Sequence, residues 1–229
     1  MKEASRRFLE SLIHAISPSG YEEEAARVWQ TEAKGFADAV RHDVHGNSHA
    51  VINPGGAPRV LLAGHCDEIG FVISHIDDNG FLWIQPIGGW DPQIPQGHRV
   101  VIRSRKGRVP GVIGKMPVHL LKAEERDKVT KLDRLWVDIG ARSRKEAEKR
   151  VAVGDPLVLD HELAELNDRV LAGRGFDNRI GAFIVLEVLR RLAKSKLKAE
   201  VHAVATVQEE IGIRGVRTAA FGIDPQIGI

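Results

Sequence analysis

The chain has 229 residues, of which 43% are hydrophobic and 28% charged, and its formal net charge is +2. This composition is typical of a globular protein and excludes a protein that is disordered as a whole. Charges of both signs are mixed along the chain, so we expect no nucleic-acid partner. We also expect no membrane contact, because no apolar run approaches the about 20 residues of a membrane helix. A single cysteine, Cys66, and a charged N-terminal segment predict a cytoplasmic protein.

The first part of the chain carries an α/β pattern. Apolar residues recur at intervals of three and four over residues 3–16, which predicts an amphipathic helix, and a second helix is predicted over residues 21–35. Short strands are predicted at 39–43 and 50–53, and an unbroken apolar run predicts a buried strand at 59–63. These elements indicate a sheet covered by helices.

The middle of the chain is rich in strand signals. Two hairpins are predicted, one turning at Asn79-Gly80 and one at Lys106-Gly107. Further strand-like runs lie at 135–139 and 156–159, with one short helix predicted at 143–150. We therefore predict a β-barrel or sandwich domain at residues 70–160, inserted between the two parts, 1–69 and 161–229, of an α/β domain.

A helix predicted over residues 178–193 and an apolar strand over 199–207 then resume the α/β pattern. Metal-competent side chains lie at three places near the ends of these elements. His65 and Asp67 follow the buried strand, where open α/β sheets bind ligands. His65 could ligate zinc, with Asp67 accepting its second N–H, although a solvated loop histidine is the simpler interpretation.

The second place is Asp177, at the start of the predicted helix. Its carboxylate could cap that helix, or its two oxygens could be shared by two metal ions. The third is the pair Glu209 and Glu210, which follows the last strand. Because neighbours on an extended chain point apart, one glutamate could bind a metal while the other acts as a general base. An exposed acidic turn is the alternative.

Taken together, these residues lie in motifs that resemble one known family. The motifs are residues 17–22 (SPSGYE), 63–71 (AGHCDEIGF), 87–91 (IGGWD), 174–179 (RGFDNR) and 208–212 (QEEIG). They resemble, in order and along essentially the whole chain, the tetrahedral, co-catalytic metalloaminopeptidases. Some members of that family are labelled deblocking or glutamyl aminopeptidases, and others endoglucanases.

The resemblance implies a mixed-sheet, zinc-peptidase-like catalytic domain interrupted by a PDZ-like β-barrel. It implies two divalent metal ions, zinc or cobalt, bound by His65, Asp177 and Glu210, with Asp177 shared between them. Glu209 would be the general base, and Asp67 would be the carboxylate that orients His65. The substrates would be peptides, and the barrel would assemble twelve copies into a homo-oligomer.

The family pattern continues beyond this sequence with an aspartate and a histidine ligand. We therefore expect the chain to be truncated at its C-terminal end, and each metal to keep two of its protein ligands. One alternative function is an oligomerising scaffold without catalysis. Another is glycoside hydrolysis, which needs two carboxylates about 5–9.5 Å apart across a sugar and leaves the histidine motif unexplained. The isolated histidines, including His49 and His202, are interpreted as solvent-facing.

Overall fold

The structure, a computed structural model, describes residues 1–161 and 163–229. The chain forms two compact units. The first contains Met1–Glu68 together with residues 163–229, and the second contains Ile69–His161. None of the helices in these described ranges combines the length and the apolar sequence that a bilayer-spanning segment requires.

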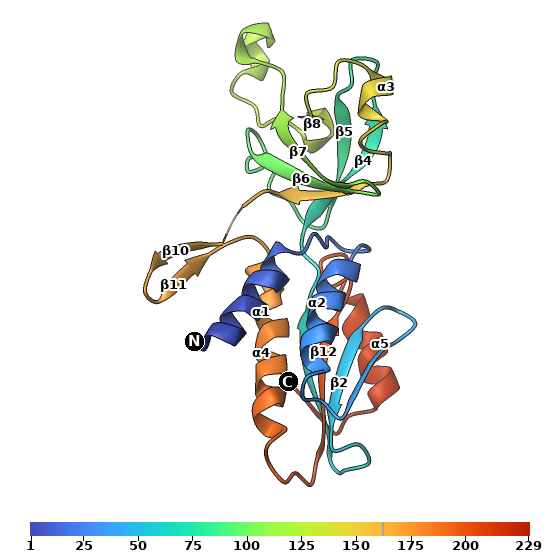
Figure 1. Ribbon diagram of the computed structural model, residues 1–229. Helices are drawn as coiled ribbons and strands as arrows, with labels where there is room; N and C mark the ends of the chain where they lie inside the picture. Colours follow the sequence, from blue (N-terminus) through green and yellow to red (C-terminus); the bar gives the residue numbers. More distant parts are fainter. Residues whose placement is uncertain (162) are drawn as a thin grey trace. The chain divides into compact units, whose positions relative to one another are not determined.

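The first unit is built on a five-stranded mixed sheet (Figure 1). The strands, in spatial order, are β1 (Ala39–His42), β2 (Ser48–Ile52), β12 (Glu200–Thr206), β3 (Arg59–His65) and β13 (Ile227–Gly228). β12 runs parallel to β3 and antiparallel to β2, and β13 runs parallel to β3. The mixed α/β fold expected from the sequence is thus confirmed.

Helices pack on both faces of this sheet. One face carries α1 (Glu3–His14), α2 (Glu23–Ala33) and α4 (Phe176–Leu192), whose apolar residues form one core with alternate residues of β2, β3 and β12. The other face carries α5 (Arg214–Ile223), which buries Ala219 and Ile223 against Leu61 and Val204. This division follows from strand geometry, because successive side chains point to opposite faces.

Gly64 lets α4 approach β3 closely. A Cβ atom at Gly64 would lie 2.4 Å from the backbone nitrogen of Ala182, which is shorter than any real Cβ contact. A glycine is therefore required at the position immediately before His65, and the close packing brings the N-terminal turn of α4 to the end of β3.

The second unit is a closed barrel of six strands, in the order β4 (Gly70–Ile76), β5 (Leu82–Ile87), β8 (Trp136–Asp138), β7 (Gly107–Gly114), β6 (Arg99–Ser104) and β9 (Pro156–Leu159). Pairing of Phe71 with Leu157 joins β4 to β9 and closes it. Three 3₁₀ turns, η1 (Val118–Leu120), η2 (Ala123–Glu125) and η3 (Leu132–Arg134), precede β8, and α3 (Arg144–Ala147) follows it. The Ser143 side chain caps α3 by accepting from the Glu146 N–H.

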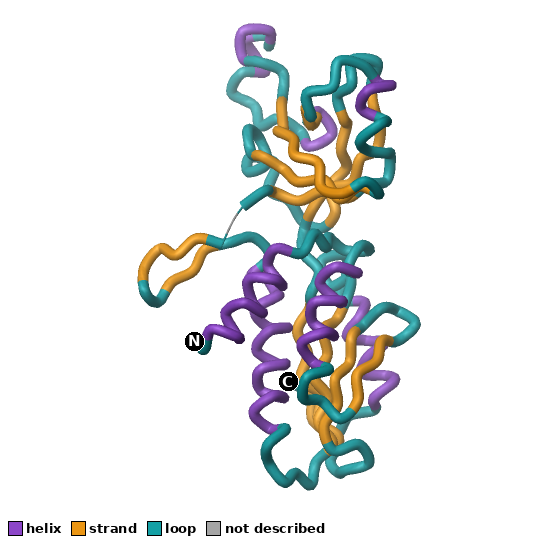
Figure 2. The backbone as a smooth tube through the Cα atoms, viewed as in Figure 1, coloured by secondary structure: helices purple, strands orange, loops and turns teal. Residues whose placement is uncertain are grey.

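The observed elements differ from those predicted from the sequence in several places. Neither α5 nor the hairpin of β10 (Ala164–Asn167) and β11 (Val170–Ala172), which is coloured as strand in Figure 2, was predicted from the sequence. The expectation that His49 and His202 face solvent was wrong. Both are buried, because they point from β2 and β12 to the sheet face that α5 covers.

Candidate metal centre

His65 is the last residue of β3, and its side chain is only 6% exposed. The sequence placed the end of this strand at residue 63, but the ladder with β12 continues two residues further and pairs His65 with Thr206. Since β3 and β12 are parallel, the residues after Thr206 emerge at the same edge of the sheet as His65. This topology brings the Glu209-Glu210 pair to the imidazole.

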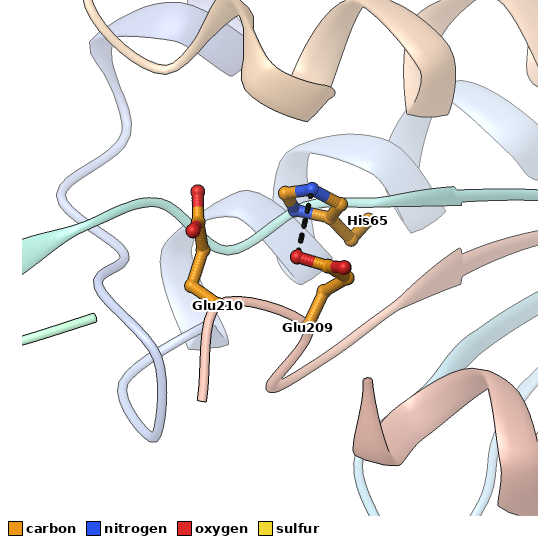
Figure 3. Close-up of side chains that lie close together, drawn as sticks. All are labelled: His65, Glu209 and Glu210. Carbon is orange, nitrogen blue, oxygen red and sulfur yellow. Dashed lines mark ion pairs between the residues drawn. The ribbon is translucent and has the colours of Figure 1, made fainter. Parts of the chain in front are cut away.

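Glu209 and Glu210 approach His65 from the segment after β12 (Figure 3). Oε2 of Glu209 lies 3.4 Å from Nε2 of His65. One ligand atom from each of the three residues lies within 4.8 Å of the other two, which is close enough for all three to bind one metal ion. The two glutamate side chains diverge from adjacent backbone positions, as Figure 3 shows.

Asp177 reaches the same imidazole from the N-terminal turn of α4. Its Oδ1 lies 3.2 Å from Nε2 of His65, and its side chain is largely exposed. Of the two alternatives for Asp177, the helix cap is contradicted, because the side chain of Asn178 rather than that of Asp177 accepts the N–H of Gly181, at 2.8 Å. The backbone is non-helical at Asp177 and Asn178, and here the Asp177 carboxylate lies beside His65.

Asp67 is fully buried on the other side of the imidazole. Its Oδ1 lies 3.4 Å from Nδ1 of His65, and its two oxygens accept the backbone N–H groups of Glu209 and Glu210, each at 3.1 Å. The hydroxyl of Ser19 donates to Oδ2 at 2.6 Å. Burial alone would raise the pKa of Asp67, but these hydrogen bonds outweigh it and hold the pKa below its usual range.

The electrostatics of the cluster suit a cation. Burial raises the pKa of Glu210, and the carboxylates of Asp177, Asp67 and Glu209 add to that rise against the opposing effect of His65. The arrangement therefore concentrates negative charge around one imidazole. One imidazole nitrogen with carboxylate oxygens is a donor set that zinc and similar divalent ions accept, and a bound cation would relieve the repulsion. The residues present fit a metal ion.

A buried ion-pair network supports the loop between His65 and the barrel. Oε1 of Glu68 accepts from Arg174 at 2.5 Å and from Arg179 at 2.8 Å. Arg179 is fully buried and also donates to the backbone carbonyls of Cys66 and Ala15. No local pattern predicts a role for these residues, although both arginines belong to the motif at 174–179 that also contains Asp177.

The α/β unit thus gathers one imidazole and several carboxylates at the carboxyl edge of its sheet, the edge at which open α/β sheets bind ligands. Residues 46–229 match the family model described as M42 glutamyl aminopeptidase. The chain therefore belongs to the M42 family, as the sequence motifs indicated.

The proteins to which this chain is similar include the following three. Lysyl aminopeptidase from Pyrococcus furiosus is 36% identical over 225 residues, which cover 96% of this chain and 64% of that protein. The crystal structure of a TET aminopeptidase from a marine sediment archaeon, Thaumarchaeota archaeon SCGC AB-539-E09, superposes with a TM-score of 0.95 at 38% identity, covering 99% of this chain and 65% of that one.

The third is the TET1 peptidase of Pyrococcus horikoshii, with a TM-score of 0.89 at 33% identity over 98% of this chain and 67% of that chain. That peptidase is described as able to assemble into a tetrahedron or a large octahedral shell. The chain thus spans slightly less than two thirds of the length of the first two proteins.

Proposed function

We propose that this chain carries part of the active site of a metal-dependent aminopeptidase, which hydrolyses the first peptide bond of peptides and so releases their N-terminal residue. The observation that carries the proposal is the convergence of His65 with the adjacent pair Glu209 and Glu210: their ligand atoms lie within 4.8 Å of one another although His65 is far from the pair in the sequence. Membership of the M42 family and similarity to aminopeptidases support the same activity.

In this proposal His65, Asp177 and Glu210 hold two divalent metal ions, zinc or cobalt, and Asp177 is shared between them. A bound divalent ion polarises a peptide carbonyl and lowers the pKa of water toward neutrality. Nδ1 of His65 faces Asp67, whose backbone carbonyl lies at 3.2 Å and whose carboxylate lies at 3.4 Å, so that Nε2 is the nitrogen available as a ligand.

Glu209 is the general base in this proposal. Its carboxylate takes a proton from the attacking water and delivers it to the leaving amine, which is the nitrogen of the broken peptide bond and becomes the new N-terminus of the shortened peptide. The two glutamate side chains leave adjacent backbone positions in different directions, which supports separate roles for them beside His65. A glutamate that does not bind the metal can take up and release a proton without removing a ligand from the metal ion.

The experiment that tests the function starts from protein treated with a chelator and then dialysed. Zinc or cobalt is added back, and release of p-nitroaniline from amino-acid p-nitroanilides is compared with release of reducing sugar from a cellulose substrate. We expect metal-dependent cleavage of the anilides only. Sugar release would favour the glycosidase alternative, and the absence of any cleavage with less than one metal ion bound per chain would favour the scaffold alternative.

We further propose that the barrel at residues 70–160 is a PDZ-like domain that joins copies of the chain into a homo-oligomer, as large as a dodecamer. Exposed apolar side chains on it support an interface, among them Met116, Val118 and Leu120. Mass photometry of the protein and of a variant with Ser at these three positions tests the proposal. A smaller assembly is expected for the variant, and an unchanged mass contradicts it.

A cytoplasmic location is also part of the proposed function. The single cysteine, Cys66, is buried and offers no surface thiol for a disulfide with another chain. Fractionation of cells that express the protein tests this location, and recovery from an oxidising compartment would contradict it.

A further inference from the structure

Four successive backbone N–H groups after β12 are each accepted by a buried or partly buried side chain from another part of the fold. Asn47 accepts the N–H of Val207 at 3.1 Å, and Glu22 accepts that of Gln208 at 3.0 Å. Asp67 accepts the next two, those of Glu209 and Glu210. Because β12 ends at Thr206, these groups have left the ladder of the sheet and need such partners.

The backbone at this point has an unusual conformation. Gln208 has a φ of 55°, in the left-handed region that non-glycine residues rarely adopt. A left-handed residue within a turn directs consecutive N–H groups toward a common acceptor, an arrangement that attracts carboxylates. The conformation of Gln208 therefore sets the directions in which the side chains of Glu209 and Glu210 leave the chain.

Glu22 is placed to maintain that conformation. Its side chain is 8% exposed, and its Oε1 accepts the N–H of Gly20 at 2.9 Å as well as that of Gln208. It belongs to the same SPSGYE motif as Ser19, which donates to Asp67. The motif is anchored in turn to Glu68, whose carbonyl accepts the N–H of Ser19. The SPSGYE segment thus supplies Glu22 and, through Ser19, contacts Asp67. These two carboxylates accept the N–H groups of residues 208–210.

We propose that Glu22 is a positioning residue, which holds the backbone of Gln208 so that Glu209 and Glu210 converge on His65. The inference rests on the proposed function, to which it adds a residue that touches neither metal nor substrate. Neighbouring side chains on an extended chain point apart, so their common orientation depends on the backbone. A rotation at Gln208 would move both glutamates at once, and Glu22, which accepts the N–H of Gln208 itself, opposes it together with Asp67, which accepts the next two.

The test uses three variants of the metal-loaded protein: E22A, E22Q and the control E23A, which changes the exposed neighbour. E22A removes the acceptor, whereas E22Q keeps an oxygen that can accept both N–H groups. The readouts are cobalt affinity by titration calorimetry, the visible absorption spectrum of the cobalt form, and kcat and KM on an aminoacyl anilide. Circular dichroism checks that each variant is folded.

For E22A we expect cobalt affinity to fall about tenfold, the loss typical of residues that support metal ligands, and kcat to fall by a similar factor. KM should change less than kcat, and the cobalt spectrum should shift. E22Q should restore the wild-type affinity and spectrum, and E23A should match the wild type. A folded E22A whose affinity, spectrum and kcat equal those of E23A would overturn the proposal.

One measurement needs no variant, and so remains decisive if E22A does not fold. Hydrogen exchange of the Gln208 amide in the wild-type protein should be slowed at least about tenfold relative to an unstructured amide, because Glu22 accepts it. Free exchange would overturn the proposal. The binding and spectral readouts also separate this inference from the proposed function: a wild-type protein that cleaves nothing, but whose cobalt spectrum changes in E22A, contradicts the function and supports the positioning role.

Discussion

Oδ1 of Asp67 lies 3.4 Å from Nδ1 of His65, and both residues are buried at the carboxyl edge of the sheet. The backbone carbonyl of Asp67 lies 3.2 Å from the same nitrogen, and Nε2 on the other side of the ring faces Asp177 and Glu209. The carboxylate of Asp67 also accepts two backbone N–H groups of the segment that carries the glutamates. One side chain therefore orients groups from two different parts of the sequence.

The variant D67N tests this role. The side-chain amide of Asn has one oxygen and one NH2 group, so it can accept a hydrogen bond at one position only. At the other position its NH2 group would face a backbone N–H group that the carboxylate accepts. We expect zinc or cobalt affinity to fall by about 10–100-fold, the usual cost of losing a carboxylate that supports a histidine ligand. Titration calorimetry measures the change. D78N, at an exposed carboxylate in the barrel, is the control, and equal affinities in both variants would contradict the assignment.

The variants E209Q and E210Q should separate the two adjacent glutamates. E209Q removes the proposed base but leaves His65, Asp177 and Glu210 in place, so we expect metal content to persist while turnover falls by about 10²–10⁴-fold. E210Q removes a proposed ligand, and we expect a loss of bound metal. Metal analysis and anilide hydrolysis measure both effects. If E209Q keeps its turnover, Glu209 is not the base.

The variant R179M should destabilise the fold. Arg179 is fully buried and pairs with buried Glu68, and its loss leaves that carboxylate with a single arginine partner and removes the donor to the backbone carbonyl of Cys66. Breaking a buried pair from one side costs about 3–5 kcal/mol of unfolding free energy. Urea unfolding measures this value.

The matched control is R144M, which breaks the exposed pair of Arg144 with Asp78. We expect that change to cost no more than about 1 kcal/mol. A similar, small loss in both variants would show that the buried network contributes little to stability.

Acidification should destabilise the fold through His49 and His202. Burial is the largest cause that lowers the pKa of each, and it outweighs the paired carboxylates of Asp43 and Glu200. In the described residues Nδ1 of each histidine has no hydrogen-bond partner. The unfolded chain therefore binds protons first as the pH falls below about 6.5, so the free energy of unfolding should decrease with falling pH.

Urea unfolding at pH 7.5 and pH 5.5 measures this effect. In a double variant with Gln at positions 49 and 202, the difference between the two pH values should shrink. The control is H75Q, at an exposed histidine of the barrel. An undiminished difference in the double variant would assign the pH dependence to other groups.

Several elements could be predicted from the sequence because their signals are local. The apolar spacing of the first helix reflects the face that it buries, and the structure has α1 at Glu3–His14. The Asn79-Gly80 turn joins β4 to β5 as predicted, because the turn conformation favours these residues. By contrast, α5 carries two glycines and several β-branched or aromatic residues, which are weak helix formers, and its helix is stabilised by the face of the sheet that it covers.

The sequence by itself therefore determined the α/β and β-rich segments, the family motifs and the residue types of a metal site, because periodicity, turn chemistry and motif spacing are written along the chain. Only the tertiary structure decided which groups meet. The parallel pairing of β3 with β12 brings His65 to the glutamates, Asp177 lies beside His65 while Asn178 takes the cap, and Glu22 reaches Gln208 across 186 residues. These contacts depend on packing between distant segments, which no local pattern records.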